Sequence, residues 1–351
     1  MVTTSIPTTT KSWTVLGTDG FDSLKFSKDT PLPAVSDYEV LVKFHAASLN
    51  YRDLIIPKGQ YPFAQKPGIV PGSDGAGEVV AVGNKVTLFK PGAKVVTLFN
   101  QGHLGGSLNP QTSATGLGGV IDGTLRQYGT FNENGLVDMP ASLNWQEAST
   151  LSCAALTAWN ALYGLNKLQP GQTVLTQGTG GVSIFAAQFA IAAGATVIST
   201  TSSAEKGELL KKLGVDHVIN YNETPDWGAK AKELTPKGEG VDHIVEVGGP
   251  TTMEQSLNAI KIDGTITIIG FLGGVQGEKQ PGFLDALVRM CTVRGVLVGN
   301  RVQFEEMNRA IEANKIKPVV DPKVFSLEDA KSAYQYMWDR KHFGKLTIKI
   351  E

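Results

Sequence analysis

The sequence predicts an α/β protein with a β-rich first domain and a second domain built on a doubly wound, parallel six-stranded sheet. Two observations support this fold class. Before about residue 155, short β-type runs are separated by Gly and Pro turn signals, such as Pro-Gly at 67/68, 71/72 and 91/92, a pattern typical of antiparallel sheets. After residue 170, six apolar β-type runs alternate with helix-like stretches, which is typical of parallel strands joined by helices.

The composition fits this fold class and excludes several functions. A chain of 351 residues is long enough for about two domains. Lys and Arg number 32 against 33 Asp and Glu, so there is no basic excess that would bind nucleic acid. Two cysteines, Cys153 and Cys291, cannot form a disulfide framework and fit a reducing compartment. The polar start and the interrupted apolar stretch 182–198 predict no secretory signal and no membrane span, so we expect a cytoplasmic protein.

The elements follow in order along the chain. In the first domain, residues 1–155, the β-type runs lie at 39–50, 75–83, 93–99 and 125–131. In the second domain, residues 156–300, we expect strands at 173–177, 195–200, 217–221, 243–247, 265–270 and 292–298, with helices that include 204–213 and 251–260. A helix at 304–313 and a last strand in 344–350 end the chain. We expect 301–351 to complete the first domain.

A glycine-rich loop opens the second domain. The strand at 173–177 leads directly into this loop, and an apolar helix follows it. In dinucleotide-binding loops the first glycine permits a tight turn, the second lets the backbone approach the pyrophosphate, and the helix N-terminus binds the phosphates. Ser183 replaces the usual third Gly or Ala, and a plain structural turn is the alternative. The strand-turn-helix context favours cofactor binding by Gly178, Thr179, Gly180, Gly181 and Val182.

The end of the next strand indicates which dinucleotide binds. NAD enzymes usually carry Asp or Glu about 20 residues past the glycines, where the carboxylate accepts from the ribose 2′-hydroxyl. Residues 198–203 contain no carboxylate. Ser202 and Lys206, with Tyr221 at the end of the third strand, therefore favour the 2′-phosphate of NADP(H). The alternative is that Ser203 only caps a helix and Lys206 is a solvated surface lysine.

Several motifs in the same order resemble one known family. They are SLNYRDL (48–54), GQY (59–61), PGSDGAGEV (71–79), PGAKV (91–95), LTAW (156–159), 242–249, 264–270, VGNR (298–301) and GK (344–345). Together with the glycine loop, they resemble the zinc-independent, quinone oxidoreductase-like branch of the medium-chain dehydrogenase/reductases. The resemblance covers nearly the whole chain. It implies a GroES-like catalytic domain, a Rossmann NADP-binding domain with a cleft between them, and a homodimer.

The strand ends carry the other expected cofactor contacts. In open α/β sheets, ligands bind outside the carboxyl ends of the strands. The resemblance implies that Gly248, Gly270 and Phe271 lie on the nicotinamide side and that Arg301 or Lys345 reaches a cofactor phosphate. The strand end at Gly299 and Asn300 belongs to the same expected site.

The resemblance also implies where a metal ion would bind. In zinc-containing relatives the catalytic metal is held at positions that are Asn50, Ser73/Asp74 and Cys153 in this chain. A catalytic zinc needs three protein ligands, and one thiolate beside the neutral side chains of Asn50 and Ser73 does not supply them. The lobe of four cysteines is also missing from the sequence. We therefore expect no metal, and Cys153 is expected to be a small buried residue.

A metal-free site favours a substrate that spreads negative charge. Hydride addition to an α,β-unsaturated carbonyl (an enone) or to a quinone gives enolate-type charge that hydrogen-bond donors stabilise, whereas an isolated ketone gives a localised alkoxide. Tyr61 matches the position of the catalytic tyrosine in enoyl-thioester reductases of the superfamily. It is the first candidate for the proton donor, with Tyr51 second, and a pocket-wall aromatic is the alternative. Asn50 is expected to donate near the nicotinamide, and Asp53 to shape the same floor or to cap a helix.

Three functions remain open from the sequence. The favoured one is an NADPH-dependent enone or quinone reductase, the second a metal-free alcohol or aldehyde dehydrogenase, and the third an NADPH-binding protein without turnover. The Gly/Ser/Thr-rich stretch at 100–123 is expected to form either a lid or a mobile insertion.

Overall fold

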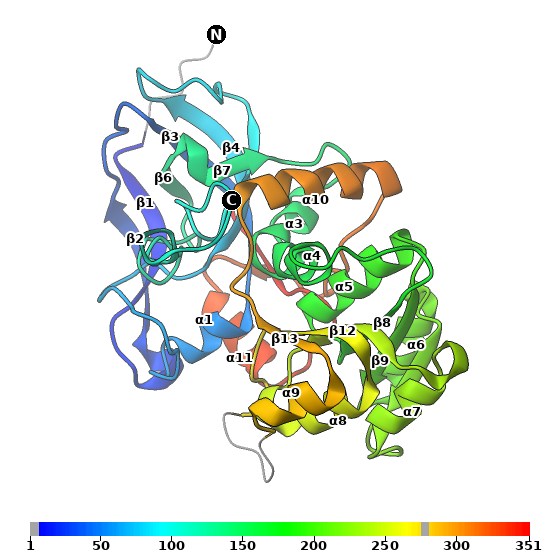
Figure 1. Cartoon of the computed structure of the whole chain (residues 1–351). Coiled ribbons are helices and arrows are strands. Elements are labelled where there is room, and N and C mark those ends of the chain that lie inside the picture. Colours follow the sequence, from blue (N-terminus) through cyan, green and yellow to red (C-terminus); the bar gives the residue numbers. More distant parts are fainter. Residues whose placement is uncertain (1–6, 275–280) are drawn as a thin grey trace. The chain divides into compact units, whose positions relative to one another are not determined.

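The computed structural model describes residues 7–274 and 281–351, and the chain divides into two compact units (Figure 1). The first unit comprises the chain up to Leu156 together with Gly299–Glu351, and the second is Thr157–Val298. Among the described helices, none is long and apolar enough to cross a membrane.

The first unit is built on a mainly antiparallel sheet of seven strands. Its order is β14-β15-β3-β4-β5-β7, and β6 also pairs with β3. These strands are β3 (Glu39–Ser48), β4 (Asp74–Val82), β5 (Lys94–Thr97), β6 (Tyr128–Asn132), β7 (Leu136–Asp138), β14 (Phe325–Ser326) and β15 (Thr347–Lys349). A separate antiparallel pair consists of β1 (Thr9–Val15) and β2 (Leu24–Pro31).

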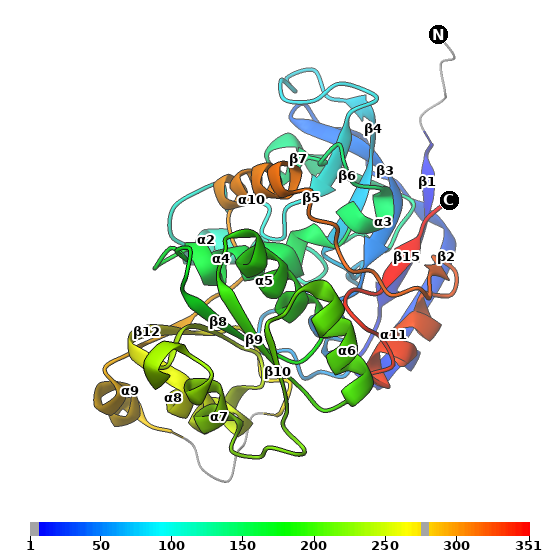
Figure 2. The ribbon, with the colours of Figure 1, turned by 90° about the vertical axis from the view of Figure 1, so that its right-hand side faces the viewer.

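The helices of the first unit are short, apart from two near the end of the chain. They are α1 (Tyr51–Ile55), α2 (Pro110–Ser113), α3 (Trp145–Ala148), α10 (Arg301–Asn314) and α11 (Ala330–Trp338), with the 3₁₀ turns η1 (Gly20–Ser23) and η2 (Glu133–Gly135) and the π turn η3 (Leu151–Ala155). The C-terminal strand β15 lies antiparallel beside β3, with Ile348 opposite Ala47 (Figure 2). The pairing of β15 with β3 brings the end of the chain next to residues 48–50, where the candidate site begins.

Strand β3 is the centre of the first core. It has neighbours on both edges, so Val40, Val42 and Phe44 are fully buried. Phe44 packs edge-on against Phe131 of β6, with ring centroids 5.6 Å apart. The apolar run predicted as a strand from the sequence is therefore a strand, and its burial comes from its central place in the sheet.

Two glycines explain part of the glycine-rich stretch at 100–123. A Cβ on Gly123 would lie 1.9 Å from the carbonyl oxygen of Gly72. Gly118 has φ of +66°, and its Cβ would lie 2.7 Å from the Gly72 backbone. Both positions must be glycine because two backbone segments touch there. This end of the stretch is packed against the segment around Gly72 within the first unit.

The second unit has the parallel sheet that the sequence predicts. Its order is β10-β9-β8-β11-β12-β13, and each of these neighbouring strands pairs in parallel with the next. The strands are β8 (Thr173–Gln177), β9 (Thr196–Thr201), β10 (His217–Asn220), β11 (Val241–Glu246), β12 (Ile260–Ile268) and β13 (Thr292–Gly295). The order reverses at β8, so the carboxyl ends of β8 and β11 meet at the point where such sheets bind ligands.

Helices cover both faces of this sheet. They are α4 (Leu156–Tyr163), α5 (Gly181–Ala192), α6 (Ala204–Leu213), α7 (Trp227–Glu233), α8 (Met253–Ala259) and α9 (Phe283–Arg289), with the 3₁₀ turns η4 (Pro236–Gly238) and η5 (Gly249–Thr251). Right-handed crossovers place α5 and α6 on one face and α7, α8 and α9 on the other, where α8 packs against both α7 and α9 (Figure 2).

Candidate active site

The predicted cofactor loop has an open surface. Gly178 follows β8 with φ of +72°, and Gly180 is the residue before α5. A Cβ on either glycine would meet no described atom within 4 Å beyond its chain neighbours. Ser183 lies inside the first turn of α5, and its hydroxyl donates to the carbonyl of Gln177 at 2.6 Å. The serine that departs from the usual pattern therefore ties the helix to the strand and leaves the loop surface free.

This loop fits the phosphates of a dinucleotide. Residues 178–182 are half-buried, and the amino end of the 12-residue helix α5 follows them. Unpaired N–H groups and the helix dipole at such an end favour an anion. The predicted residues Thr179, Gly181 and Val182 lie in this segment, and their contacts with a cofactor stay a prediction.

The end of β9 carries the residues expected at the adenosine ribose. Ser203 caps α6, since its hydroxyl accepts from the backbone N–H of Lys206 at 3.4 Å, as the alternative interpretation expected. Ser202 is exposed, and the N–H of Tyr221 donates to Thr201, which places Tyr221 beside this strand end. The next carboxylate along the chain, Glu205, lies exposed in the first turn of α6.

A buried carboxylate organises the end of β11, and sequence reasoning missed it. Glu246 accepts from the backbone N–H groups of Gly248 and Gly249, each at 2.9 Å, and from the Gln177 amide at 2.6 Å. The hydroxyls of Thr252 and Ser256 also donate to it. The sequence signal that could have identified Glu246 is its position as the one charged residue in the apolar run HIVEV (243–247). Glu246 thereby joins the ends of β8 and β11.

The predicted residues beyond β12 lie along this turn. Leu272 and Gly273, which follow Gly270 and Phe271, donate backbone hydrogen bonds to Val247 and Gly248. Their place beside the end of β11 is consistent with the expected nicotinamide side, which stays a prediction.

Three other predicted cofactor residues lie in the first unit. Asn300, which follows Gly299, caps α10 by accepting from the N–H of Gln303 at 2.9 Å. Arg301 donates to the carbonyl of Asn134 at 3.1 Å and pairs with Glu305 at 2.8 Å. These contacts of Asn300 and Arg301 are structural, and a role toward the cofactor stays a prediction.

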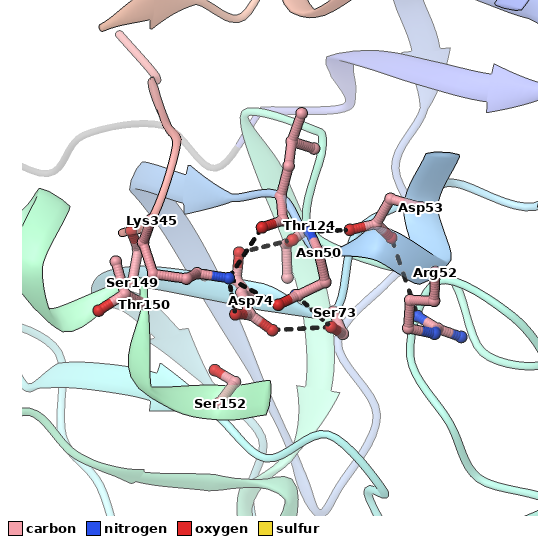
Figure 3. A network of polar contacts seen from close by, with 12 residues as sticks. Asn50, Arg52, Asp53, Ser73, Asp74, Thr124, Ser149, Thr150, Ser152 and Lys345 are labelled. Atoms are coloured by element: carbon pink, nitrogen blue, oxygen red, sulfur yellow. Dashed lines mark hydrogen bonds and ion pairs between the residues drawn. The ribbon is translucent and has the colours of Figure 1, made fainter. Parts of the chain in front are cut away.

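A buried polar network lies at the carboxyl end of β3 (Figure 3). The ammonium of Lys345 donates to the Leu49 carbonyl at 2.8 Å and to Asn50 Oδ1 at 2.6 Å, and it lies 3.4 Å from Asp74 Oδ2. The side chains of Lys345 and Asp74 are 4% and 0% exposed. Ser73 donates to the other Asp74 oxygen at 2.7 Å. The sequence predicts Lys345 as one of two candidates for a phosphate contact, whereas in the structure its ammonium is engaged inside this network.

Asn50 and Asp53 form the start of α1. The backbone N–H of Asn50 donates to Asp53 Oδ2 at 2.8 Å, so Asp53 caps the helix, which was one of its two expected roles. The other oxygen, Oδ1, accepts no hydrogen bond from any described residue and lies 3.9 Å from an Arg52 nitrogen. Burial raises the pKa of Asp53 to about 6, although the nearby Arg52 charge opposes this rise.

The raised pKa of Asp53 predicts a pH-dependent stability. The unfolded carboxyl has a pKa of 3.8 and the folded one about 6, so between these values only the folded chain keeps the proton. Stability therefore falls as the pH rises through this window, by about 3 kcal/mol in total. We expect Asp53→Asn to gain about that much relative to the unmodified protein between pH of about 4 and about 7, measured by urea denaturation. Parallel pH curves for the two proteins would contradict this assignment.

Tyr61 is held by an arginine that the sequence analysis did not single out. Arg52 Nε donates to Tyr61 Oη at 3.2 Å, and the guanidinium lies 5.0 Å from the centre of the Tyr61 ring. Arg52 Nη1 donates to the carbonyl of Leu117 at 2.8 Å, inside the glycine-rich stretch. Tyr51, the second candidate, lies at the start of α1 and packs partly buried against the first core. The structure thus brings Asn50, Asp53, Arg52 and Tyr61 into one connected region.

The position expected for a third zinc ligand carries a neutral thiol. Cys153 lies in the π turn η3, and burial together with the Asp74 charge raises the pKa of its thiol to about 12. Across residues 7–274 and 281–351, no three His, Cys, Asp or Glu side chains gather as they would around a metal ion. The donor set is therefore a protonated thiol, an amide and a carboxylate already paired with Lys345, which is a poor fit to zinc.

Comparisons with known proteins identify the family. Residues 36–141 match the model of the alcohol dehydrogenase GroES-like domain, and residues 181–313 match that of the zinc-binding dehydrogenases. Over 336 residues the chain is 45% identical to a zinc-type alcohol dehydrogenase-like protein of Schizosaccharomyces pombe, covering 95% of this chain and 96% of that one. The chain belongs to the medium-chain dehydrogenase/reductase family.

Two further relatives place this medium-chain dehydrogenase/reductase among oxidoreductases. It is 30% identical over 350 residues to 2-methylene-furan-3-one reductase of Solanum lycopersicum, with 98% of this chain and 80% of that one covered. The crystal structure of a putative alcohol dehydrogenase from Sinorhizobium meliloti 1021 matches with a TM-score of 0.89 at 36% identity, covering 98% of this chain and all of that one. These comparisons confirm the predicted family and its GroES-like and Rossmann-like parts. They also confirm that the family depends on a nicotinamide cofactor.

Proposed function

We propose that the protein is an NADPH-dependent reductase that transfers hydride to an α,β-unsaturated carbonyl or to a quinone without a metal ion. One observation carries this proposal. Two of the three positions that would bind zinc in related enzymes are Asn50 and Asp74. The ammonium of Lys345 already contacts both, at 2.6 Å from Asn50 Oδ1 and 3.4 Å from Asp74 Oδ2. Because the ammonium of Lys345 engages the groups that would face a metal ion, hydrogen-bond donors are the means by which this site would polarise a substrate.

Asn50 is the residue we assign to the substrate oxygen. Its amide oxygen accepts from Lys345, so the amide nitrogen is the end that can donate. Among the described residues, the contact of that nitrogen is a long one, 3.5 Å to Ser73 Oγ. A neutral donor of this kind is enough for an enolate, whose charge is spread by conjugation, whereas a localised alkoxide needs a Lewis acid or a stronger proton donor.

The chemistry is divided between the cofactor and the chain. When bound, the reduced nicotinamide supplies a hydride to the β carbon of the conjugated carbonyl or to the quinone. The chain then has to hold the resulting anion at Asn50 and deliver one proton, which we assign to Tyr61, to the α carbon or to the quinone oxygen. Water returns the proton to the tyrosine.

The glycine loop and the end of β9 support NADPH as the cofactor. Gly178 and Gly180 leave an open surface at the start of α5, and the exposed Ser202 and the half-buried Ser203 carry hydroxyls where NAD enzymes carry a carboxylate. We expect Ser202→Asp to weaken NADPH binding about tenfold or more, because the carboxylate introduced at this position would repel the 2′-phosphate. NADH binding should be unchanged or improved. Titration calorimetry measures both affinities.

The same substitution at an exposed serine of the first unit, Ser332→Asp in α11, is the matched control. It should leave both affinities unchanged. Equal weakening of NADPH and NADH by Ser202→Asp, or a preference of the unmodified protein for NADH, would contradict the assignment.

Single-turnover kinetics test the function itself. The protein loaded with NADPH is mixed in a stopped-flow instrument with an enone, a quinone, a simple aldehyde or a saturated ketone, with and without a chelator. We expect oxidation of bound NADPH by the enone or the quinone, unaffected by the chelator. Reaction with only the simple aldehyde or ketone would support an alcohol or aldehyde dehydrogenase, and no reaction with any of them would support a binding protein without turnover.

A homodimer formed through the edge of the second sheet is supported by an exposed apolar surface. Strand β13 lies at one edge of the sheet. Four large apolar side chains of α9 and one just after it are exposed, namely Phe283 (99% exposed), Leu284, Leu287 and Val288, and then Met290. Monomers rarely expose such a patch, and an open strand edge can pair with its own copy about a two-fold axis.

Light scattering tests the dimer. We expect the mass of two chains, and the double variant Leu287→Glu/Val288→Glu is expected to give the mass of one because charges would be buried in the interface. Leu209→Glu on α6, also at an exposed leucine, is the control that should remain dimeric. A monomeric unmodified protein would overturn the proposal.

The reducing cytoplasm is the compartment that we propose. Cys153 and Cys291 are both free thiols. Free thiols and a redox cofactor such as NADPH fit a compartment in which disulfides are rare.

A further inference from the structure

We infer that Arg52 is a positioning residue for Tyr61: its guanidinium fixes the direction of the phenol O–H and stabilises the phenolate left after proton transfer. This inference rests on the proposed function, in which Tyr61 delivers the proton. It assigns a task to a buried charge that the proposed function does not otherwise use.

The contact between the two side chains sets the direction of the phenol proton. Arg52 Nε–H donates to Tyr61 Oη at 3.2 Å, and a guanidinium has no acceptor, so the phenol cannot donate back to it. The guanidinium carbon also lies 5.0 Å from the centre of the Tyr61 ring, a cation–π contact. Ring and hydroxyl are thus both held, and the O–H proton is directed away from Arg52 toward another acceptor.

Arg52 is itself held by groups from other segments. Nη1 donates to the Leu117 carbonyl at 2.8 Å, and the guanidinium lies 4.7 Å from the centre of the Phe99 ring. A Cβ on Gly119 would lie 2.9 Å from Arg52 Nη2, so this glycine leaves room for the guanidinium. The stretch 100–123, which the sequence could not assign to a lid or to an insertion, contributes the anchor for Arg52.

The charge of Arg52 is incompletely neutralised in the resting state. Its side chain is 9% exposed, yet the nearest Asp53 oxygen is 3.9 Å away, beyond hydrogen-bond distance. Its two closest oxygen partners are the Leu117 carbonyl and the Tyr61 hydroxyl, which are both neutral. A phenolate at Tyr61 would supply the missing negative charge within a charge-assisted hydrogen bond.

The proton-transfer step balances. Hydride addition leaves an electron pair on the α carbon of the enolate, and this pair forms a C–H bond with the phenol proton. The O–H electron pair stays on Tyr61 as phenolate beside Arg52. A proton from water then restores the phenol, so no further oxidant or reductant is needed.

A double-mutant cycle tests this role. We measure kcat for an enone at saturating NADPH, across pH, in Arg52→Gln, Arg52→Lys, Tyr61→Phe and the combined variants. We expect Arg52→Gln to lower kcat by about tenfold to a hundredfold when Tyr61 is present and less than about threefold when it is Phe, with Arg52→Lys recovering part of the loss. An equal loss in both backgrounds would mean that Arg52 is only structural and would overturn the inference.

Two arms separate the possible failures. If Tyr61→Phe keeps normal turnover, the proton-donor assignment fails, whatever Arg52 does. If Arg52→Gln does not fold, Arg52→Lys is compared by ¹⁹F NMR after incorporation of 3-fluorotyrosine, with the Tyr61 signal identified by its loss in Tyr61→Phe. We expect that signal to shift in Arg52→Lys, and an unchanged signal would overturn the inference without reference to activity.

Discussion

Tyr61→Phe is expected to lower kcat for enone reduction by about 10²- to 10³-fold while leaving the affinity for NADPH unchanged. The phenol is the proton source in the proposed reaction, and a positioned general acid contributes a factor of this size. The phenylalanine ring keeps the packing against the first core and the contact with Phe63, whose ring centre lies 5.3 Å away. Stopped-flow turnover with saturating NADPH and an enone measures the effect.

Two other tyrosines serve as comparisons for this variant. Tyr38→Phe changes an exposed tyrosine just before β3 and should leave kcat unaltered. Tyr51→Phe tests the second candidate. Normal turnover in Tyr61→Phe together with a large loss in Tyr51→Phe would move the proton donor to Tyr51.

Lys345→Met is expected to reduce the free energy of unfolding by about 3–5 kcal/mol. The ammonium is the cation beside the fully buried Asp74 and also serves Leu49 and Asn50, so its removal would leave a buried charge and two carbonyl-type oxygens without their donor. Chemical denaturation followed by tyrosine and tryptophan fluorescence measures the loss.

The same strand region supplies the control for this variant. Lys349→Met removes an exposed lysine that pairs with the exposed Glu351, and a change within about 0.5 kcal/mol is expected. Adding Asp74→Asn to Lys345→Met should restore part of the loss because it removes the unpaired charge. Equal effects at both lysines would contradict the buried ion pair.

The second unit was predictable because its signals are local. Each strand of the parallel sheet is a short apolar run beside a helical stretch, and β8, β9 and β10 lie within a residue of their predicted ranges. The sixth strand was expected to reach residue 298 but ends at Gly295, and Val298 has φ of +52°, so the chain turns there. Backbone direction after a strand depends on tertiary contacts, such as the one from the Asn160 amide to the Val298 carbonyl, which periodicity does not contain.

The candidate site was only partly predictable. Asn50, Asp53 and Tyr61 lie close together in the chain, so motifs could identify them. Lys345 is 295 residues from Asn50, and only the pairing of β15 with β3 brings them together. The burial of the Lys345 ammonium and of the Arg52 guanidinium could not be predicted, because a lysine or an arginine is expected at the surface.

The position of a transferred deuterium tests directly whether the protein delivers hydride to the β carbon of a conjugated carbonyl. NADPH deuterated at C4 of the nicotinamide is incubated with the protein and an α,β-unsaturated ketone, which offers both a C=C and a C=O bond, and the product is analysed by NMR. We expect a saturated ketone with deuterium on the β carbon and a solvent-derived hydrogen on the α carbon. Deuterium on the carbinol carbon of an allylic alcohol, or no transfer from NADPH to any conjugated substrate, would contradict it.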